Sequence, residues 1–293
     1  MNLAAVIVLA LKTSLVLIQF GLGLEVTLED LTYLFKRPGL LLRSLFSMNI
    51  AMPLFAVVLV LAFKGLHPAV KVALVTLAVA PIPPILPKKA VKAGGRSSYM
   101  FGLLVGSGLL SILFVPLAME LLEIVFQTPL QMSPLAVAPL VLIGVVVPLA
   151  AGMAVHRFAP RLADRLAKPV SLVATLLLVI AILPLFFAAR GAIGSLIGNG
   201  TLTAIAGFVL AGLTFGHLLG GPDSGDRIVL GLSTAARHPG VALAIADANF
   251  PEQRTLIMAA LLLYLLVNAI VTIPYQISMK RRHSKTAAGA VGR

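Results

Sequence analysis

The sequence contains no cysteine, and charged residues make up only 11% of its 293 positions. Without cysteine the chain has no disulfide bonds and no thiolate metal sites, and its redox compartment stays undetermined. Soluble domains carry about one quarter charged residues, so the low charge excludes an ordinary soluble protein. The formal net charge of +13 does not indicate nucleic acid binding, because the basic residues form short clusters between long apolar runs.

Apolar sequence is what the chain has in abundance. Hydrophobic residues make up 59% of it, and the mean hydropathy is +1.05. This composition predicts an all-α polytopic membrane protein, with residues 1–293 as a single transmembrane domain. Stretches of about 20 apolar residues each predict nine spans. They cover 2–24, 39–63, 68–94 with an interruption, 97–122, 133–156, 167–189, 200–219, 226–249 with an interruption, and 254–279. The first stretch has no basic start and no cleavage signature, which indicates a retained helix and not a signal peptide.

The basic residues predict how these spans are oriented. With nine spans, seventeen basic residues fall on one side of the membrane and four on the other. The seventeen are Lys36, Arg37, Arg43, Lys88, Lys89, Lys92, Arg96, Arg157, Arg161, Arg165, Lys168, Arg227, Lys280, Arg281, Arg282, Lys285 and Arg293; the four are Lys64, Lys71, Arg190 and Arg254. Because cytoplasmic loops carry the excess of Lys and Arg, we expect the N-terminus outside and the C-terminus in the cytoplasm, in a bacterial inner membrane.

Two of the predicted spans are interrupted at their centres. The eighth carries Arg237, His238, Pro239 and Gly240 in succession. Proline and glycine disfavour a continuous helix there, and an arginine at bilayer depth costs about 2.5 kcal/mol or more. The third span is interrupted by a cluster of prolines, namely Pro81, Pro83, Pro84 and Pro87.

The two interruptions occupy matching positions in spans that run in opposite directions. Pro83 lies twelve residues after Lys71, and Pro239 lies twelve residues after Arg227. Spans one to four and six to nine therefore form a predicted inverted repeat, with span five unpaired. Pairs of broken helices related by such a repeat build the solute sites of many secondary transporters.

At this point the chain resembles the bile acid:sodium symporter family, in its nine-helix form. The resemblance is carried by FGLGLEVTLEDLTYLFKRPGLLLRSLFSMNIAMPLFAV from Phe20 to Val57, with its Met52-Pro53 pair, and by the two broken segments VAPIPPILPKKAVKAGG and GLSTAARHPGVALAIA. It implies a core of residues 39–122 and 200–279, in which the broken helices cross. It also implies a panel of residues 1–24 and 133–189. The family binds its solute in the cleft between the two parts.

The departures from the family pattern concern its sodium ligands. By this alignment the family's glutamate falls on Ser233, its glutamine on Arg237 and its asparagine on His238, while its serine-asparagine pair falls on Leu86 and Pro87. Sodium requires oxygen ligands, and most of these are gone. We therefore hypothesise that fixed cations replace sodium at the negative ends of the helix dipoles, and that transport is independent of sodium.

Several residues are candidates for binding the solute or for replacing the sodium charge. Arg237 is the main one, as a charge surrogate or an anchor for an anion. His238 either carries a proton or bonds an unwound carbonyl. Lys88 and Lys89 follow the third-span break, and are either part of the crossing or ordinary cytoplasmic lysines. Lys12, with Thr13 and Gln19, is a candidate solute contact on the panel. Ser233 and Thr234 are expected to bond the backbone freed by the break.

These residues predict a secondary transporter for a small organic anion, with no catalytic residue, metal ligand or cofactor. Its other partner is the lipid bilayer, and the oligomeric state stays open. Two alternatives remain. Asp223 and Asp226 are spaced like half of a metal-diphosphate motif, as in a membrane enzyme acting on lipid or diphosphate, although a solvated turn explains them as well. The other is a transporter-derived sensor, against which the lack of a soluble signalling domain argues.

Overall fold

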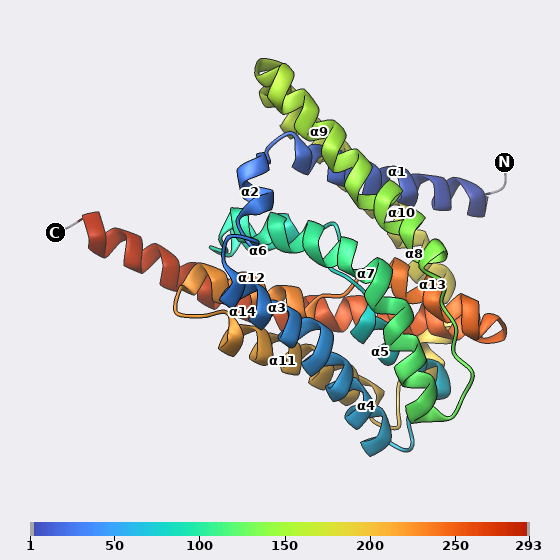
Figure 1. Cartoon of the computed structure of the whole chain (residues 1–293). Coiled ribbons are helices and arrows are strands. Elements are labelled where there is room, and N and C mark those ends of the chain that lie inside the picture. The colour runs from blue at the N-terminus through green and yellow to red at the C-terminus, as the bar shows by residue number, and fades with distance from the viewer. Residues whose placement is uncertain (1–2, 292–293) are drawn as a thin grey trace.

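The computed structural model describes the backbone of residues 3–291 and the side chains of residues 5–281. Every element in that part of the chain is a helix (Figure 1). The helices are α1 (Leu3–Gly23), α2 (Leu28–Thr32), α3 (Pro38–Leu45), η1 (Phe46–Ala51), α4 (Met52–Ala62), α5 (Pro68–Val79), α6 (Leu86–Lys92), α7 (Ser97–Phe126), α8 (Pro134–Val141), η2 (Leu142–Val146), α9 (Val147–Phe158), α10 (Pro160–Leu196), α11 (Thr201–Leu219), α12 (Ser224–Ala235), α13 (Pro239–Asn249), η3 (Pro251–Gln253) and α14 (Arg254–Val291). Arg282, Lys285 and Arg293 of the charge pattern lie outside the described side chains.

The helices confirm a polytopic membrane protein. Within residues 3–291, eight helical stretches are long and apolar enough to cross a membrane. The predicted third span is not among them, because it consists of two short helices: α5, with 12 residues, and α6, with 7. The count of nine spans therefore stays a prediction.

Helix α10 is much longer than the span predicted at 167–189. It covers 37 residues, from Pro160 to Leu196. Hydropathy marks only the part that suits hydrocarbon, whereas backbone hydrogen bonding continues until a residue interrupts it. Here the helix stops just before Gly198, Asn199 and Gly200, which all have positive φ values.

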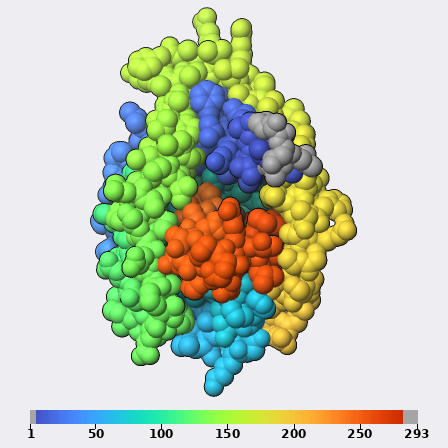
Figure 2. Space-filling model, turned by 90° about the vertical axis from the view of Figure 1, so that its right-hand side faces the viewer, coloured from blue at the N-terminus to red at the C-terminus, as the bar shows by residue number. Residues whose placement is uncertain are grey.

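Helices α1, α9 and α10 pack together on one side of the molecule, at the top of Figure 1. Helices α1 and α9 meet at a pair of glycines: a Cβ on Gly23 would lie 2.2 Å from the carbonyl oxygen of Leu149, and one on Gly152 would lie 2.2 Å from that of Phe20. Figure 2 views the end at which the N-terminus lies and shows a hollow between α1, in blue, and the segment around α13, in orange.

Helices α11 and α12 lie in backbone contact along a ladder of three glycines, Gly212, Gly216 and Gly220. A Cβ on any of them would come within 2.2 to 2.6 Å of α12 backbone atoms. Small residues four apart allow helix axes to approach closely. This contact fixes α12, whose C-terminal end leads into the second interruption.

Both predicted interruptions are present, but they lie slightly before some of the predicted residues. The first covers residues 80–85, between α5 and α6, and the second covers residues 236–238, between α12 and α13. Pro87, Pro239 and Gly240 were expected in the breaks and instead lie in the first turns of α6 and α13. Proline suits the first turn of a helix, because its missing N–H has no acceptor there and its φ is already helical.

Candidate functional site

The two interruptions meet, as the sequence predicts. The backbone N–H of His238 donates to the carbonyl of Pro81 at 2.8 Å. Helices α5 and α12 end at this point, and helices α6 and α13 begin beside it. Four helix termini therefore converge, and their backbone groups lack the partners that a continuous helix would supply.

Arg237 fills the centre of this crossing. Its side chain is 2% exposed. The guanidinium donates to three backbone carbonyls: Nη2 to Met48 at 2.7 Å, Nη1 to Ala80 at 3.2 Å and Nε to Thr234 at 3.2 Å. One side chain therefore joins predicted spans two, three and eight.

Each of these carbonyls is free because the regular helical hydrogen bonding is disturbed nearby. Helix η1 is π-helical, and its register continues in the bond from Met52 N–H to the Ser47 carbonyl. The next donor in that register would be Pro53, which has no N–H, so the Met48 carbonyl is left without a partner. Thr234 would accept from His238 in a continuous helix, but His238 bonds Pro81 instead. The carbonyl of Ala80 lies just beyond the end of α5.

The positive charge of Arg237 is balanced by dipoles and not by a carboxylate. The ion pairs within the described side chains involve Arg96 and Arg254, not Arg237. The C-terminal ends of α5 and α12 both point into the crossing, and the end of a helix carries a partial negative charge. A guanidinium, with five donors in a planar fork, suits several carbonyls at once.

The backbone next to Arg237 is also saturated. The backbone N–H of Arg237 donates to the hydroxyl of Tyr264 at 2.8 Å, and that hydroxyl donates to the carbonyl of Ala235 at 2.9 Å. Asn268 donates to the same carbonyl at 3.1 Å. In a continuous helix the carbonyl of Ala235 would accept from residue 239, but Pro239 has no N–H to donate. Helix α14 therefore satisfies what the proline leaves open.

His238 does not bond an unwound carbonyl through its ring, contrary to one of its two expected roles. Its Nδ1 accepts from the backbone N–H groups of Gly240 at 3.1 Å and Val241 at 3.3 Å, which caps α13. This arrangement requires a lone pair on Nδ1, so the ring carries its proton on Nε2. Protonation of Nδ1 would remove both bonds, which disfavours a proton-carrying role.

Ser233 and Thr234 do not bond the freed backbone through their hydroxyls. The hydroxyl of Ser233 donates to the sulfur of Met100 at 3.7 Å, and that of Thr234 lies 2.9 Å from the hydroxyl of Ser47. Both side chains are fully buried. They tie α12 to α7 and η1, and the carbonyls are left to Arg237.

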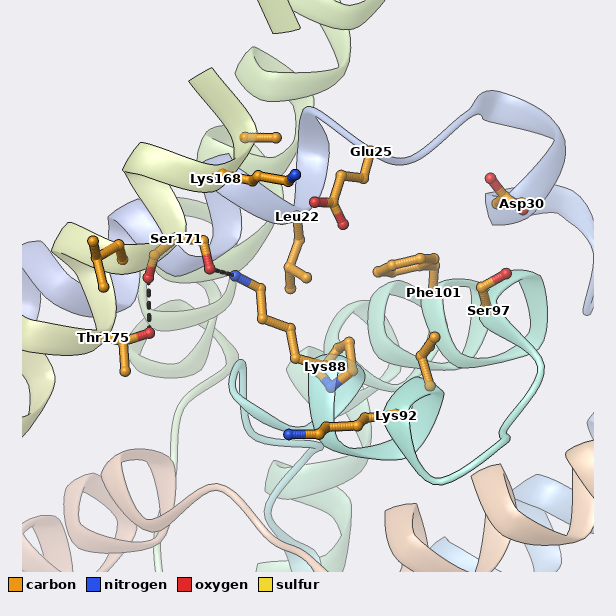
Figure 3. Close-up of a pocket in the computed structure, with 14 residues that line it drawn as sticks. Leu22, Glu25, Asp30, Lys88, Lys92, Ser97, Phe101, Lys168, Ser171 and Thr175 are labelled. Carbon is orange, nitrogen blue, oxygen red and sulfur yellow. Dashed lines mark hydrogen bonds between the residues drawn. The ribbon is translucent and has the colours of Figure 1, made fainter. Parts of the chain in front are cut away.

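A cavity of about 660 Å³ lies among α1, α2, α6, α7 and α10 (Figure 3). Apolar side chains form much of its wall, together with lysines and hydroxyl groups. It is lined by Leu22, Glu25, Asp30, Pro87, Lys88, Val91, Lys92, Ser97, Phe101, Ala167, Lys168, Ser171, Leu172 and Thr175. Apolar pockets with a few polar groups are typical of small-molecule sites.

A transporter family matches more than half of the chain. The chain fits the profile of the sodium bile acid symporter family over residues 13–195. The chain belongs to this family. The symporter match begins within α1, includes the first interruption and nearly all of α10, and ends before Arg237. Comparison with curated proteins gives no match. Together, the family match and the long apolar helices of the chain identify it as an integral membrane transporter.

The structure separates the two lysines that were expected at the symporter crossing. Lys88 lines the cavity and donates a hydrogen bond to the hydroxyl of Ser171 on α10 (Figure 3). Lys89, the next residue, is exposed and does not line the cavity. Neither contributes a hydrogen bond to the crossing among the described side chains, where Arg237 alone supplies the cation.

The predicted panel residues also separate. Lys12 and Thr13 are exposed on α1, and neither lines the cavity. Gln19 is fully buried, and neither its amide oxygen nor its amide nitrogen has a hydrogen-bond partner. A role in solute binding remains a prediction for all three.

Asp223 and Asp226 have a partner that sequence reasoning missed. Both carboxylates bond Arg96, which precedes α7; the Nε of Arg96 lies 2.7 Å from Asp226 Oδ1. The hydroxyl of Ser98, two residues further on, donates to Asp30. Within the part of the chain that the structure describes, no group of three His, Cys, Asp or Glu residues is placed to hold a metal. The sequence offered one signal for such ion pairs. Acidic residues are far fewer than basic ones, so each carboxylate has many possible basic partners.

Proposed function

We propose that the protein is a sodium-independent secondary transporter of a small organic anion, driven by movement of a core against a panel. The core consists of residues 39–122 and 200–279, and the panel of residues 1–24 and 133–189. The N-terminus faces outward and the C-terminus faces the cytoplasm of a bacterial cell.

The observation that carries this proposal is the position of the Arg237 guanidinium. It bonds carbonyls from both interrupted spans and from the π-helical turn of the second span, at the point where the C-terminal ends of α5 and α12 converge. A cation that is covalently attached to the protein cannot dissociate during the transport cycle. The charge that a sodium symporter takes from solution is therefore permanent in this chain, and no sodium gradient enters the energetics.

The cavity supports an anionic solute. Lys88, Lys92 and Lys168 line it, while Glu25 and Asp30 are its acidic lining residues. Figure 3 shows Lys168 beside Glu25, whereas the ammonium group of Lys88 donates its hydrogen bond to the neutral hydroxyl of Ser171. The ammonium group of Lys88 therefore has charge available for a carboxylate, and the apolar wall suits the rest of an organic acid.

The test is uptake of labelled organic acids into vesicles that contain the purified protein. Cholate, pyruvate, succinate and benzoate, which differ in size and apolarity, are supplied with an inward gradient of sodium or of potassium. We expect the same initial rate in both salts for each acid that is transported. A rate several times higher with sodium would contradict the proposal.

A pair of variants tests the role of the fixed cation. Arg237→Gln removes the charge at the crossing, and Arg190→Gln makes the same change at an exposed arginine of α10. We expect sodium to raise the melting temperature of Arg237→Gln, because a free cation is then needed at the carbonyls. The wild type and Arg190→Gln should not respond. A sodium response of the wild type would argue against the charge-replacement role.

A further inference from the structure

Lys88 connects helix α6, in the predicted core, to helix α10, in the predicted panel. Its ammonium group donates to the hydroxyl of Ser171, across one side of the cavity (Figure 3). Lys88 is half-buried, so the bond is shielded in part from water. Any movement of the core relative to the panel along this cavity has to break it.

The partner of Lys88 is neutral, although charged groups lie nearby. Glu25 lies in the segment after α1, and Lys168 and Lys92 line the same cavity. None of the ion pairs within the described side chains includes Lys88. The bond from the Lys88 ammonium to Ser171 is already charge-assisted, but a carboxylate acceptor adds a Coulomb attraction that a neutral hydroxyl lacks. A carboxylate in the cavity would therefore displace Ser171 from Lys88.

We propose that Lys88 and Ser171 form a latch that makes the protein an exchanger of organic anions. This inference rests on the proposed function, that is, on transport of an organic anion through the cavity. Without solute, the latch joins core to panel and holds the empty carrier in the state in which it forms. A bound anion takes the ammonium of Lys88, releases Ser171 and allows the two parts to move.

The consequence concerns the step in which an empty carrier returns across the membrane. A bond to a charged group contributes enough stability to slow that step about tenfold or more. The loaded carrier does not meet this barrier in either direction. Solute should therefore cross mainly in exchange for solute on the other side.

The experiment compares two conditions with the four labelled acids named above, each in its own assay. Vesicles with the full-length protein are loaded with unlabelled acid or left without acid, and entry of the labelled acid is measured. For the transported acids we expect entry about tenfold faster into loaded vesicles. Equal rates into loaded and empty vesicles would overturn the latch while leaving the proposed transport function intact.

Two variants identify the bond responsible. Ser171→Ala removes the acceptor of Lys88 but leaves the ammonium in place for the anion. With this variant in the membrane, we expect the labelled acid to enter empty and loaded vesicles at similar rates. Thr175→Val is the matched control, because Thr175 lies one turn further along α10, lines the same cavity and bonds the Ser171 carbonyl at 2.7 Å and not Lys88.

The outcomes separate the two proposals. A preserved tenfold ratio in Ser171→Ala would overturn the latch, as would a loss of the ratio in Thr175→Val equal to that in Ser171→Ala. If none of the four acids enters wild-type vesicles in either condition, the transport function fails and the latch fails with it.

Discussion

At the scale of single residues, the centre of this protein is a cation without an anion. Arg237 is surrounded by backbone carbonyls, and its neighbours His238 and Tyr264 bond further backbone groups of the same crossing. Prolines explain why so many acceptors are available, since each removes a donor from the helix that follows. Interrupted spans in a membrane must satisfy these groups within the protein, because lipid offers no hydrogen bonds.

Replacement of Arg237 by methionine should destabilise the protein by about 3 kcal/mol, because three buried carbonyls lose a charged donor. We expect a lower melting temperature in detergent that is partly restored by millimolar guanidinium chloride, whose cation fits the vacated site. Arg254→Met removes the exposed arginine of an ion pair with the half-buried Asp247 and should cost less than about 1 kcal/mol. A guanidinium effect of equal size in both variants would mean that the rescue is unspecific.

At the scale of helices, close backbone packing holds the broken span in position. Helix α12 contributes Thr234 and the second interruption, and it lies against the glycine ladder of α11. A shift of α12 by a fraction of an ångström would move one carbonyl relative to the two that come from η1 and α5. The packing of α11 against α12 therefore determines the geometry of the crossing.

Two alanine substitutions in α11 should have opposite effects. In Gly216→Ala the new Cβ would lie 2.2 Å from the Leu230 carbonyl oxygen, so α12 must shift, at a cost of about 1 to 3 kcal/mol. In Gly207→Ala the Cβ meets nothing within 4 Å, and alanine favours the helix by up to about 1 kcal/mol. Thermal unfolding of both variants measures the difference. A stabilised Gly216→Ala would contradict the close packing.

At the scale of the whole molecule, the connections between the predicted core and panel decide what moves together. Helix α2 lies on the segment between α1 and α3. It begins with a capping box formed by Thr27 and Asp30, and Ser98 at the start of α7 also donates to Asp30. In the proposed movement of core against panel, this segment stays with α7, and movement of α1 is absorbed between Gly23 and Thr27.

The attachment of α2 should depend on pH. Burial raises the pKa of the Asp30 carboxyl, but the hydrogen bonds from Ser98 and Thr27 outweigh burial and hold it below the ordinary 3.8. A lowered pKa in the folded state means that the ionised carboxylate stabilises the fold above about pH 4, and that this contribution is lost as pH falls further.

Hydrogen exchange of residues 28–37 measures this contribution. We expect Ser98→Ala to exchange faster than the wild type at pH 7, and the difference to shrink as the pH falls below the ordinary 3.8 and Asp30 becomes protonated. Ser107→Ala is the control, because Ser107 bonds only the Leu104 carbonyl of its own helix. A difference that persists unchanged at pH 3 would mean that the Asp30 charge is not involved.

The sequence by itself determined the class of the protein and the place of its interruptions. Hydropathy identified the membrane helices, because hydrocarbon requires long apolar stretches. Prolines identified both breaks to within a few residues, because proline cannot donate the helical bond. Arg237 was predicted in the second break, where a guanidinium at bilayer depth needs buried partners. That the broken helices cross was implied by the resemblance to the family.

Only the tertiary structure decided what each polar group bonds. Three examples are the bond from Arg237 to the Met48 carbonyl, the bond from Lys88 to Ser171 and the bonds from Arg96 to two aspartates. Each joins residues that lie 83 to 189 positions apart in the sequence. Local sequence fixes which backbone groups a helix leaves unpaired, but partners at such separations are chosen by how the helices pack. For the same reason, sequence alone did not distinguish the role of Lys88 from that of its neighbour Lys89.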